Sequence, residues 1–135
     1  MPIRVLLADD HSEFRKCLRS LLESQTEIEV IAEAASGRDA VALAAKLKPD
    51  IAVLDVCMKP LSGIQAIPGI LHLSPHTAVL MCSMHKDDRY VMKSIGAGAK
   101  GYVLKDSGDD EILEAIRSLS RGHIYFGSCH PRQLH

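Results

Sequence analysis

The sequence contains no tryptophan, and its aromatic content is only 4%. A base-stacking surface for single-stranded nucleic acid therefore has little to be built from. An excess of charge of one sign is missing as well, because 16 Lys and Arg residues face 17 Asp and Glu residues and the formal net charge is −1. Without a general positive field, we expect no direct binding to nucleic acid or to an anionic membrane.

Long hydrophobic runs and paired cysteine motifs are also absent. The first apolar run, at residues 5–8, ends at Asp9 and is too short for a signal-peptide core. No run approaches the roughly 18 apolar residues that a membrane span needs. The four cysteines have no CxxC spacing, and we interpret them as reduced thiols. These features predict a cytoplasmic protein.

What is present has the composition of one soluble globular domain. The chain has 135 residues, of which 47% are hydrophobic and 24% charged, a length that suits a single core. Apolar runs alternate with segments in which apolar residues recur every three or four positions, the period of a half-buried helix. We predict strands at 3–8, 28–32, 51–54, 77–82 and 101–104, and helices at 14–22, 40–47, 63–73, 87–95 and 112–119.

This strict alternation is typical of a three-layer α/β/α fold, in which helices cover both faces of a five-stranded parallel sheet. One helix is expected to depart from regular geometry. Pro68 and Gly69 lie inside the segment 63–73, and an interior proline costs a helix about 3 kcal/mol. We therefore expect the third helix to be short or distorted.

Polar residues follow the predicted strands, and in sheets of this type ligands bind beyond the carboxyl ends of the strands. An acidic pair at such a place is often only a turn and a helix cap, and a single Ser or Lys is often solvated surface. Compatible side chains at four of the five strand ends nevertheless favour a site. In chain order, the strand ends carry Asp9 with Asp10, Glu33, Asp55, Ser83 and Lys105.

Aspartates gathered at one edge of a sheet repel one another, by roughly 4 kcal/mol for two charges about 4 Å apart at an effective dielectric of about 20. Such a cluster raises its pKa values or binds a cation. Oxygen ligands favour Mg²⁺ over Zn²⁺. The three aspartates and Lys105 sum to −2, which a divalent cation would neutralise before a phosphoryl group approaches. Ser83 and Lys105 offer donors to its oxygens, and an aspartate can be the nucleophile.

Several segments match motifs of a known family. They are VLLADDH at 5–11, KPD at 48–50, DVCM at 55–58 with Gly63, SMH at 83–85 and GAKGYVLKD at 98–106. On these motifs the sequence resembles the receiver domains of two-component response regulators of the NarL/FixJ (LuxR-type) subfamily. The resemblance runs from about residue 3 to about residue 125. It implies a flavodoxin-like (CheY-like) fold with strand order 2-1-3-4-5.

The resemblance also implies a role for each acidic residue. Asp55 is the expected phosphoacceptor. The expected ligands of Mg²⁺ (or Mn²⁺) are Asp9, Asp10, Asp55 and the backbone carbonyl of Cys57. Lys105 would pair with the phosphoryl group. The phosphoryl donor would be a sensor histidine kinase or a small phosphodonor. We expect no enzymatic activity beyond self-phosphotransfer and autodephosphorylation.

Two further residues would form the switch. The resemblance implies that Ser83 moves to bind a phosphoryl oxygen and that Tyr102 responds by changing its rotamer. The surface beside them would then change, altering homodimerisation or contact with an output domain. We assign residues 1–122 to the receiver and 123–135 to a C-terminal tail or truncated linker. The DNA-binding domain through which the subfamily controls transcription is accordingly expected to be absent from this chain.

Two loop residues are candidate modulators of the site. Lys59 stands where the family usually has proline after Met58, and Pro60 follows it, so the loop beside Asp55 is expected to take another path and to bring a positive charge. His85, two residues beyond Ser83 in the sequence, either influences hydrolysis of an acyl phosphate or is a solvated loop residue.

Two other functions stay open. An aspartate-nucleophile phosphohydrolase also uses Mg²⁺ and an acyl phosphate, but such enzymes typically carry a second Asp at the position that Cys57 occupies here. A phosphorylation-independent interaction module, or pseudo-receiver, would keep the fold without the chemistry. Filled positions at all key sites argue against it, whereas Lys59 keeps it open.

Overall fold

The computed structural model describes residues 2–84 and 86–129, and these form five strands and five helices in strict alternation. All strand pairs are parallel, and the order across the sheet is β2-β1-β3-β4-β5, which confirms the predicted fold class. The strands are β1 Ile3–Ala8, β2 Ile28–Ala34, β3 Ile51–Asp55, β4 Ala78–Ser83 and β5 Gly101–Leu104. The helices are α1 Ser12–Glu23, α2 Gly37–Leu47, α3 Gly63–Leu73, α4 Asp88–Ala97 and α5 Asp109–Ser120, followed by a short 3₁₀ helix, η1, at Gly127–Cys129.

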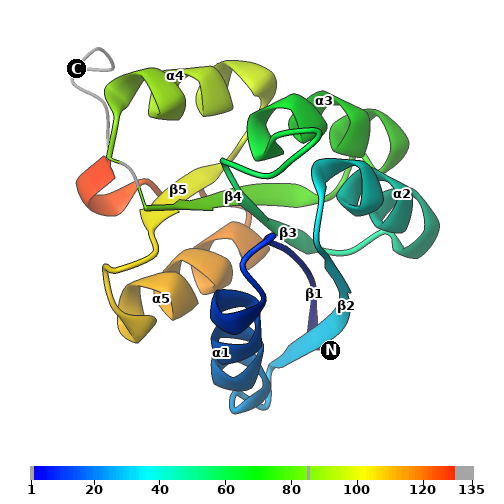
Figure 1. The fold of residues 1–135 in the computed structure, drawn as a ribbon. Helices are drawn as coiled ribbons and strands as arrows, with labels where there is room; N and C mark the ends of the chain where they lie inside the picture. The colour runs from blue at the N-terminus through cyan, green and yellow to red at the C-terminus, as the bar shows by residue number, and fades with distance from the viewer. Residues whose placement is uncertain (1, 85, 130–135) are drawn as a thin grey trace.

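The sheet lies between two layers of helices (Figure 1). α1 and α5 cover one face, and α2, α3 and α4 cover the other. Successive strand residues point to opposite faces: Leu6 and Leu54 pack under α2 and α3, whereas Val5 and Val53 pack against α1 and α5. Because both faces of the sheet are covered, the central strands β1, β3 and β4 are nearly continuous apolar runs, and this is why their positions could be predicted. The edge strand β2 carries the exposed Glu29.

The third helix corrects one expectation. α3 runs without interruption from Gly63 to Leu73, the range predicted from the sequence, so the expectation that Pro68 would shorten this helix is wrong. Its start is fixed by a capping box: Oγ of Ser62 accepts from the backbone N–H of Gln65 at 3.1 Å, and the N–H of Ser62 donates to Oε1 of Gln65 at 3.0 Å. Fully buried side chains on either side of the proline outweigh its single missing hydrogen bond.

The chain after α5 returns to the sheet and packs along β5. The backbone N–H of Tyr102 donates to the carbonyl of Tyr125 at 3.0 Å, and the N–H of Tyr125 donates to the carbonyl of Lys100 at 2.9 Å. Phe126 and Cys129 are buried in the same core cluster as Tyr102. We call residues 124–129 the C-terminal segment. The predicted boundary at residues 122/123 stays a prediction, and the last six residues lie outside the described part.

Two predicted absences concern the membrane and disulfides. In the part of the chain that the structure describes, no helix combines the length and apolar character needed to cross a membrane. None of the four cysteines, all of which lie in the described part, forms a disulfide; Cys17 and Cys57 are exposed, and Cys82 and Cys129 are buried.

Candidate functional site

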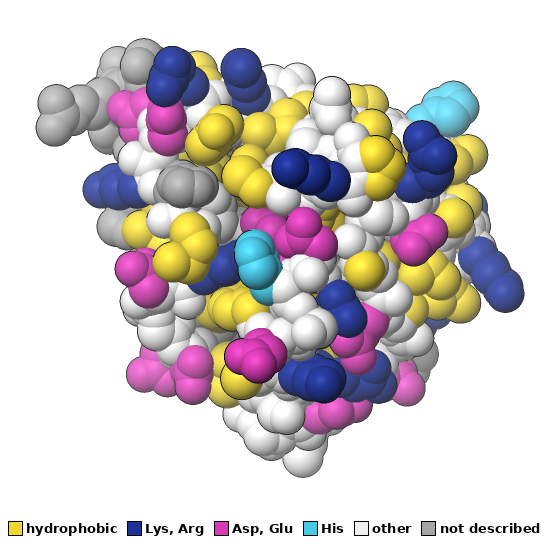
Figure 2. Space-filling model, viewed as in Figure 1, with side chains coloured by type: hydrophobic (Ala, Val, Ile, Leu, Met, Phe, Trp, Pro, Cys, Tyr) yellow, Lys and Arg dark blue, Asp and Glu magenta, His cyan; other side chains and the backbone are white. Residues whose placement is uncertain are grey.

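The carboxyl ends of β1, β3 and β5 bring four of the predicted site residues to one edge of the sheet. Asp9 and Asp10 follow β1, Asp55 ends β3, and Lys105 follows β5. The last residue of β1 pairs with the penultimate residue of β3, which places Asp9 beside Asp55. Ligand atoms of the three aspartates and of His11 all lie within 4.8 Å of one another. Acidic side chains and a histidine accordingly gather at the centre of the face in Figure 2, over the end of β3.

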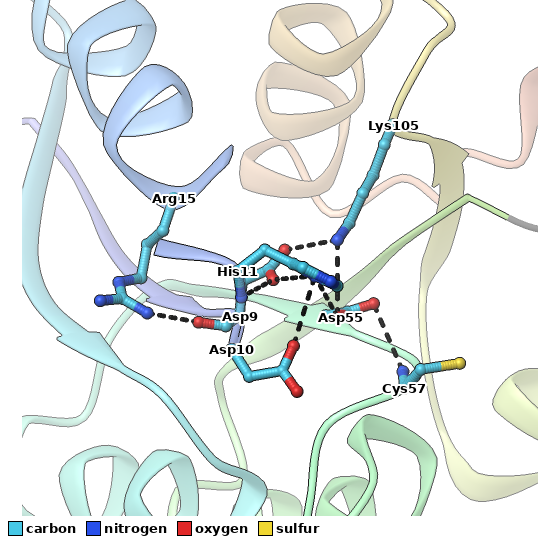
Figure 3. Close-up of polar contacts among 7 residues, drawn as sticks. All are labelled: Asp9, Asp10, His11, Arg15, Asp55, Cys57 and Lys105. Atoms are coloured by element: carbon cyan, nitrogen blue, oxygen red, sulfur yellow. Dashed lines mark hydrogen bonds and ion pairs between the residues drawn. The ribbon is translucent and has the colours of Figure 1, made fainter. Parts of the chain in front are cut away.

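Lys105 lies against two of the carboxylates (Figure 3). Its Nζ is 2.7 Å from Oδ2 of Asp9 and 3.5 Å from Oδ2 of Asp55, and its side chain is only 5% exposed. The ammonium also lies 4.6 Å from the centre of the Phe14 ring. Burial alone would lower the pKa of Lys105, but its hydrogen bond to Asp9 and the charge of Asp55 outweigh burial and raise the pKa. Lys105 is therefore a fixed positive charge at neutral pH.

Asp55 is 4% exposed, and among the described residues only one of its two carboxylate oxygens accepts a hydrogen bond. Its Oδ1 accepts a hydrogen bond from the backbone N–H of Cys57 at 3.3 Å. Its Oδ2 has no hydrogen-bond partner among residues 2–84 and 86–129. Burial raises the pKa of Asp55, and the charge of Asp9 raises it further against the opposing effect of Lys105. A buried carboxylate oxygen without a hydrogen-bond donor is the kind of group that a cation stabilises.

The donor set fits a hard divalent cation. Three carboxylates and one ammonium leave a net charge of −2 in a cluster whose oxygens come from three aspartates, and Mg²⁺ prefers carboxylate oxygens together with water. Nδ1 of His11 lies 3.3 Å from Oδ1 of Asp9 and 3.3 Å from Oδ1 of Asp10. The unsatisfied Oδ2 of Asp55 supplies a further acceptor. The residues present therefore fit the metal that the sequence predicts.

Cys57 has an exposed thiol, and the thiol takes no part in the cluster. Partial loss of water around its sulfur and the charge of Asp55 raise the pKa of Cys57, so the thiol stays protonated at neutral pH. The residue contributes its backbone N–H to Asp55. The predicted role of its backbone carbonyl stays a prediction.

Ser83 and Tyr102 form a second, buried polar pair on β4 and β5. Ser83 is 1% exposed and Tyr102 is 0% exposed. Burial raises the pKa of Tyr102 to about 12, and a hydrogen bond with Ser83 acts in the opposite direction. The structure thus joins the two predicted switch residues to each other.

The loop between β3 and α3 carries Lys59 on its exposed side. Among the described residues, no ion pair or hydrogen bond links Lys59 to Asp55. Gly63 shows why the loop closes tightly: a Cβ atom there would lie 2.1 Å from the backbone oxygen of Asp55, so only glycine fits. The other predicted modulator, His85, lies outside the described residues.

Three contacts of the site were not predicted from the sequence. His11 points its ring into the acidic cluster, Phe14 lies beside Lys105, and Arg15 donates to the backbone carbonyl of Asp9. All three belong to the helix that follows β1 or to its N-cap. The sequence signal was their position: side chains in the first turn of such a helix face the strand end that precedes it.

Comparison with known proteins agrees with this geometry. The model of the response regulator receiver domain family matches residues 5–117. The transcriptional regulatory protein YxjL of Bacillus subtilis is 40% identical over 124 residues, which cover 92% of this chain and 57% of that protein. The response regulator VraR of Staphylococcus aureus is 38% identical over 126 residues, which cover 93% of this chain and 60% of that protein. This chain therefore spans less than two thirds of the length of these relatives.

A solved structure gives the same result. A LuxR-family response regulator from Aurantimonas superposes with a TM-score of 0.88 at 33% identity, covering 93% of this chain and 89% of that chain. LuxR/NarL-type regulators are thus among the relatives of this sequence, which confirms the resemblance drawn from its motifs. With the family model matching most of the chain, the protein belongs to the response regulator receiver domain family.

Proposed function

We propose that the chain is a phosphoacceptor that takes a phosphoryl group onto Asp55, from a sensor histidine kinase or a small phosphodonor, in a Mg²⁺-dependent step. The observation that carries the proposal is the buried Oδ2 of Asp55, which lacks a hydrogen-bond donor and lies 3.5 Å from the ammonium of Lys105. An oxygen placed in this way is available as a nucleophile and has a positive charge beside it.

The transfer forms one bond and breaks one. A carboxylate oxygen of Asp55 attacks phosphorus, and the bond from phosphorus to the donor's nitrogen or oxygen breaks, so that the donor leaves with its electron pair. Lys105 balances the negative charge that the phosphoryl oxygens bring into the cluster. Asp9, Asp10, Asp55 and the carbonyl of Cys57 would hold Mg²⁺ (or Mn²⁺), which neutralises phosphoryl oxygens when bound.

The switch in this proposal is an exchange of hydrogen-bond partners. The hydroxyl of Ser83 now bonds Tyr102, and it would turn to a phosphoryl oxygen on Asp55. Tyr102 would then lose a partner inside the core and repack. Its neighbours on α4, on β5 and in the C-terminal segment would repack with it, so that one new dianionic group biases a two-state element.

The output of the switch is proposed by analogy with the relatives. Proteins such as YxjL and DegU are named transcriptional regulatory proteins, and this chain matches 57% and 55% of their lengths. We propose that phosphorylation alters homodimerisation or contact with an output domain that binds DNA, and that the receiver itself does not bind nucleic acid. Free thiols and a kinase partner fit a cytoplasmic location.

Intact-mass measurement after incubation with acetyl phosphate and Mg²⁺ tests the proposal. The wild-type chain is expected to gain the mass of one phosphoryl group, and Asp55→Asn none. Asp106→Asn is the matched control, because it makes the same change on an exposed carboxylate one residue beyond Lys105. No added mass in the wild type would favour the interaction module. Repeated turnover of a phosphoester by each chain, without a partner, would favour the phosphohydrolase.

A further inference from the structure

Glu33, at a strand end but outside the acidic cluster, joins two arginines of α1. Its Oε1 accepts from Nε of Arg15 at 2.8 Å, and its Oε2 accepts from Nη1 of Arg19. The hydrogen bonds to Arg19, and then to Arg15, outweigh burial and lower the pKa of Glu33, so the carboxylate is charged at neutral pH. This bridge ties β2 to α1 across the end of β1.

Arg15 extends the bridge to the acidic cluster (Figure 3). While its Nε bonds Glu33, its Nη1 donates to the backbone carbonyl oxygen of Asp9. With this contact, each backbone and side-chain polar atom of Asp9 has a partner. The N–H donates to the carbonyl of Ala34 at 3.0 Å, Oδ1 accepts from the N–H of His11 at 2.8 Å, and Oδ2 lies 2.7 Å from Nζ of Lys105.

The carbonyl that Arg15 binds belongs to the peptide between Asp9 and Asp10. A peptide group is planar, so fixing its oxygen also fixes the direction in which the chain continues to Asp10. Few contacts hold Asp10 in place: its side chain is 34% exposed, and among the described residues its carboxylate forms an ion pair only with Nδ1 of His11, at 3.3 Å. The placement of the second aspartate therefore depends on the guanidinium of Arg15.

Glu33 has two effects on this arrangement. Glu33 orients the planar guanidinium of Arg15 by accepting a hydrogen bond from Nε, which leaves Nη1 free to donate to the Asp9 carbonyl. Glu33 also balances the positive charge of Arg15. The guanidinium therefore does not cancel the negative charge that the aspartates offer to a metal ion. Arg19 donates to the other carboxylate oxygen of Glu33, and within the described part of the chain no hydrogen bond or ion pair joins Arg19 to the aspartates.

We propose that Arg15, oriented by Glu33, is a positioning residue that sets the Asp9–Asp10 peptide and thereby the affinity of the acidic cluster for Mg²⁺. This inference rests on the proposed function. It concerns the binding of the ion rather than the phosphoryl transfer, and so it can be tested without a phosphodonor.

Direct titration of Mg²⁺ by calorimetry into wild-type, Arg15→Gln and Lys16→Gln chains tests the proposal. Removing a positive charge near a cation site would by charge alone tighten binding. Loss of positioning predicts the opposite, a weakening of about tenfold or more, as is usual when a group supporting metal ligands is removed. Lys16→Gln is the matched control and is expected to stay within about twofold of wild type, because it removes an exposed, screened positive charge from α1 one residue beyond Arg15.

Thermal unfolding separates positioning from loss of the fold. If Arg15→Gln does not fold, Arg15→Lys replaces it, since lysine keeps the charge but cannot bond Glu33 and the Asp9 carbonyl through one planar fork. Weakened Mg²⁺ binding by a folded Arg15 variant supports the proposal, and unchanged or tighter binding overturns it. A wild-type chain that binds Mg²⁺ but accepts no phosphoryl group would overturn the proposed function alone. A wild type that binds no Mg²⁺ would overturn both.

Discussion

The two sides of the site differ in how their polar groups are held. On the β1 side, meaning Asp9 and the residues that bind it, each polar atom of the aspartate has a partner on the backbone, on α1 or on the β5–α5 loop. On the β4 side, meaning Ser83, Tyr102 and the C-terminal segment, a buried serine shares a hydrogen bond with a tyrosine. The first side is organised in advance, whereas the second holds the hydrogen bond that the proposed switch would exchange.

This difference suits the proposed switch. A group that must meet a metal and a phosphoryl group with fixed geometry gains from pre-organisation. A group that must respond gains from having two alternative partners of similar energy.

The largest effect is expected from removing the buried charge on the β1 side. Lys105→Met leaves Asp9 without its 2.7 Å partner and Asp55 without a neighbouring positive charge. We expect the rate of phosphorylation by acetyl phosphate to fall about a hundredfold. The control is Lys100→Met, an exposed lysine before β5. A Lys105→Met chain that reacts at the wild-type rate would contradict the contrast between the two sides, because the β1 side would then contribute nothing to the phosphorylation rate.

The next effect concerns the packing of the β4 side. Phe126 is 5% exposed and packs in the cluster that contains Tyr102. Phe126→Ala is expected to lower the free energy of unfolding by about 3 kcal/mol, measured by urea denaturation. Ile124→Ala, at a side chain that is 61% exposed, should change it by about 0.5 kcal/mol at most. If Phe126→Ala is as mild as Ile124→Ala, the C-terminal segment does not belong to the core.

A smaller effect is expected when the exchangeable bond itself is removed. Ser83→Ala should slow phosphorylation by about fivefold, the equivalent of roughly 1 kcal/mol for one neutral hydrogen bond. Its Mg²⁺ affinity should equal that of the wild type, because Ser83 is not among the cluster ligands. Rate and affinity falling together would mean that the two sides are not separate. Stopped-flow kinetics measures the phosphorylation rate, and calorimetry measures the Mg²⁺ affinity.

The smallest effect is a shift in melting temperature with pH. The pKa of Asp55 is raised in the folded chain, chiefly by burial. Its contribution to stability is therefore full below the ordinary carboxyl pKa and is lost as the pH rises through the raised value. At pH 7, Asp55→Asn should melt at a higher temperature than wild type, and the difference should shrink as the pH approaches about 4. A lower melting temperature at pH 7 would contradict the cost assigned to this buried charge.

Much of the fold could be predicted because its signals are local. The central strands are apolar runs buried on both faces, and most helices show an apolar face at the helical period. The strand order came from family motifs, since periodicity does not say which strands are neighbours. The range of the third helix was predicted, but its shortening was expected wrongly, because the local cost of Pro68 was weighed without the cap at Ser62 and the burial around it.

The site, like the fold, could be predicted where its signals are local and not where they depend on long-range packing. Asp9, Asp55 and Lys105 were found because strand ends converge at one edge of a parallel sheet. The contact from Arg15 to Asp9 was not found, because it joins a helix side chain to a backbone carbonyl and depends on how α1 docks. The return of residues 124–129 to β5 depends likewise on long-range packing. The local sequence of this segment, which we interpreted as a tail, does not indicate that packing.

Locating the phosphoryl group on the chain tests the central claim most directly. After incubation with acetyl phosphate and Mg²⁺, borohydride reduces an aspartyl phosphate to homoserine, and peptide mass spectrometry identifies the position that was reduced. The account predicts homoserine at position 55 alone. Homoserine at position 9 or 10, or at no position in a chain that binds Mg²⁺, would contradict it.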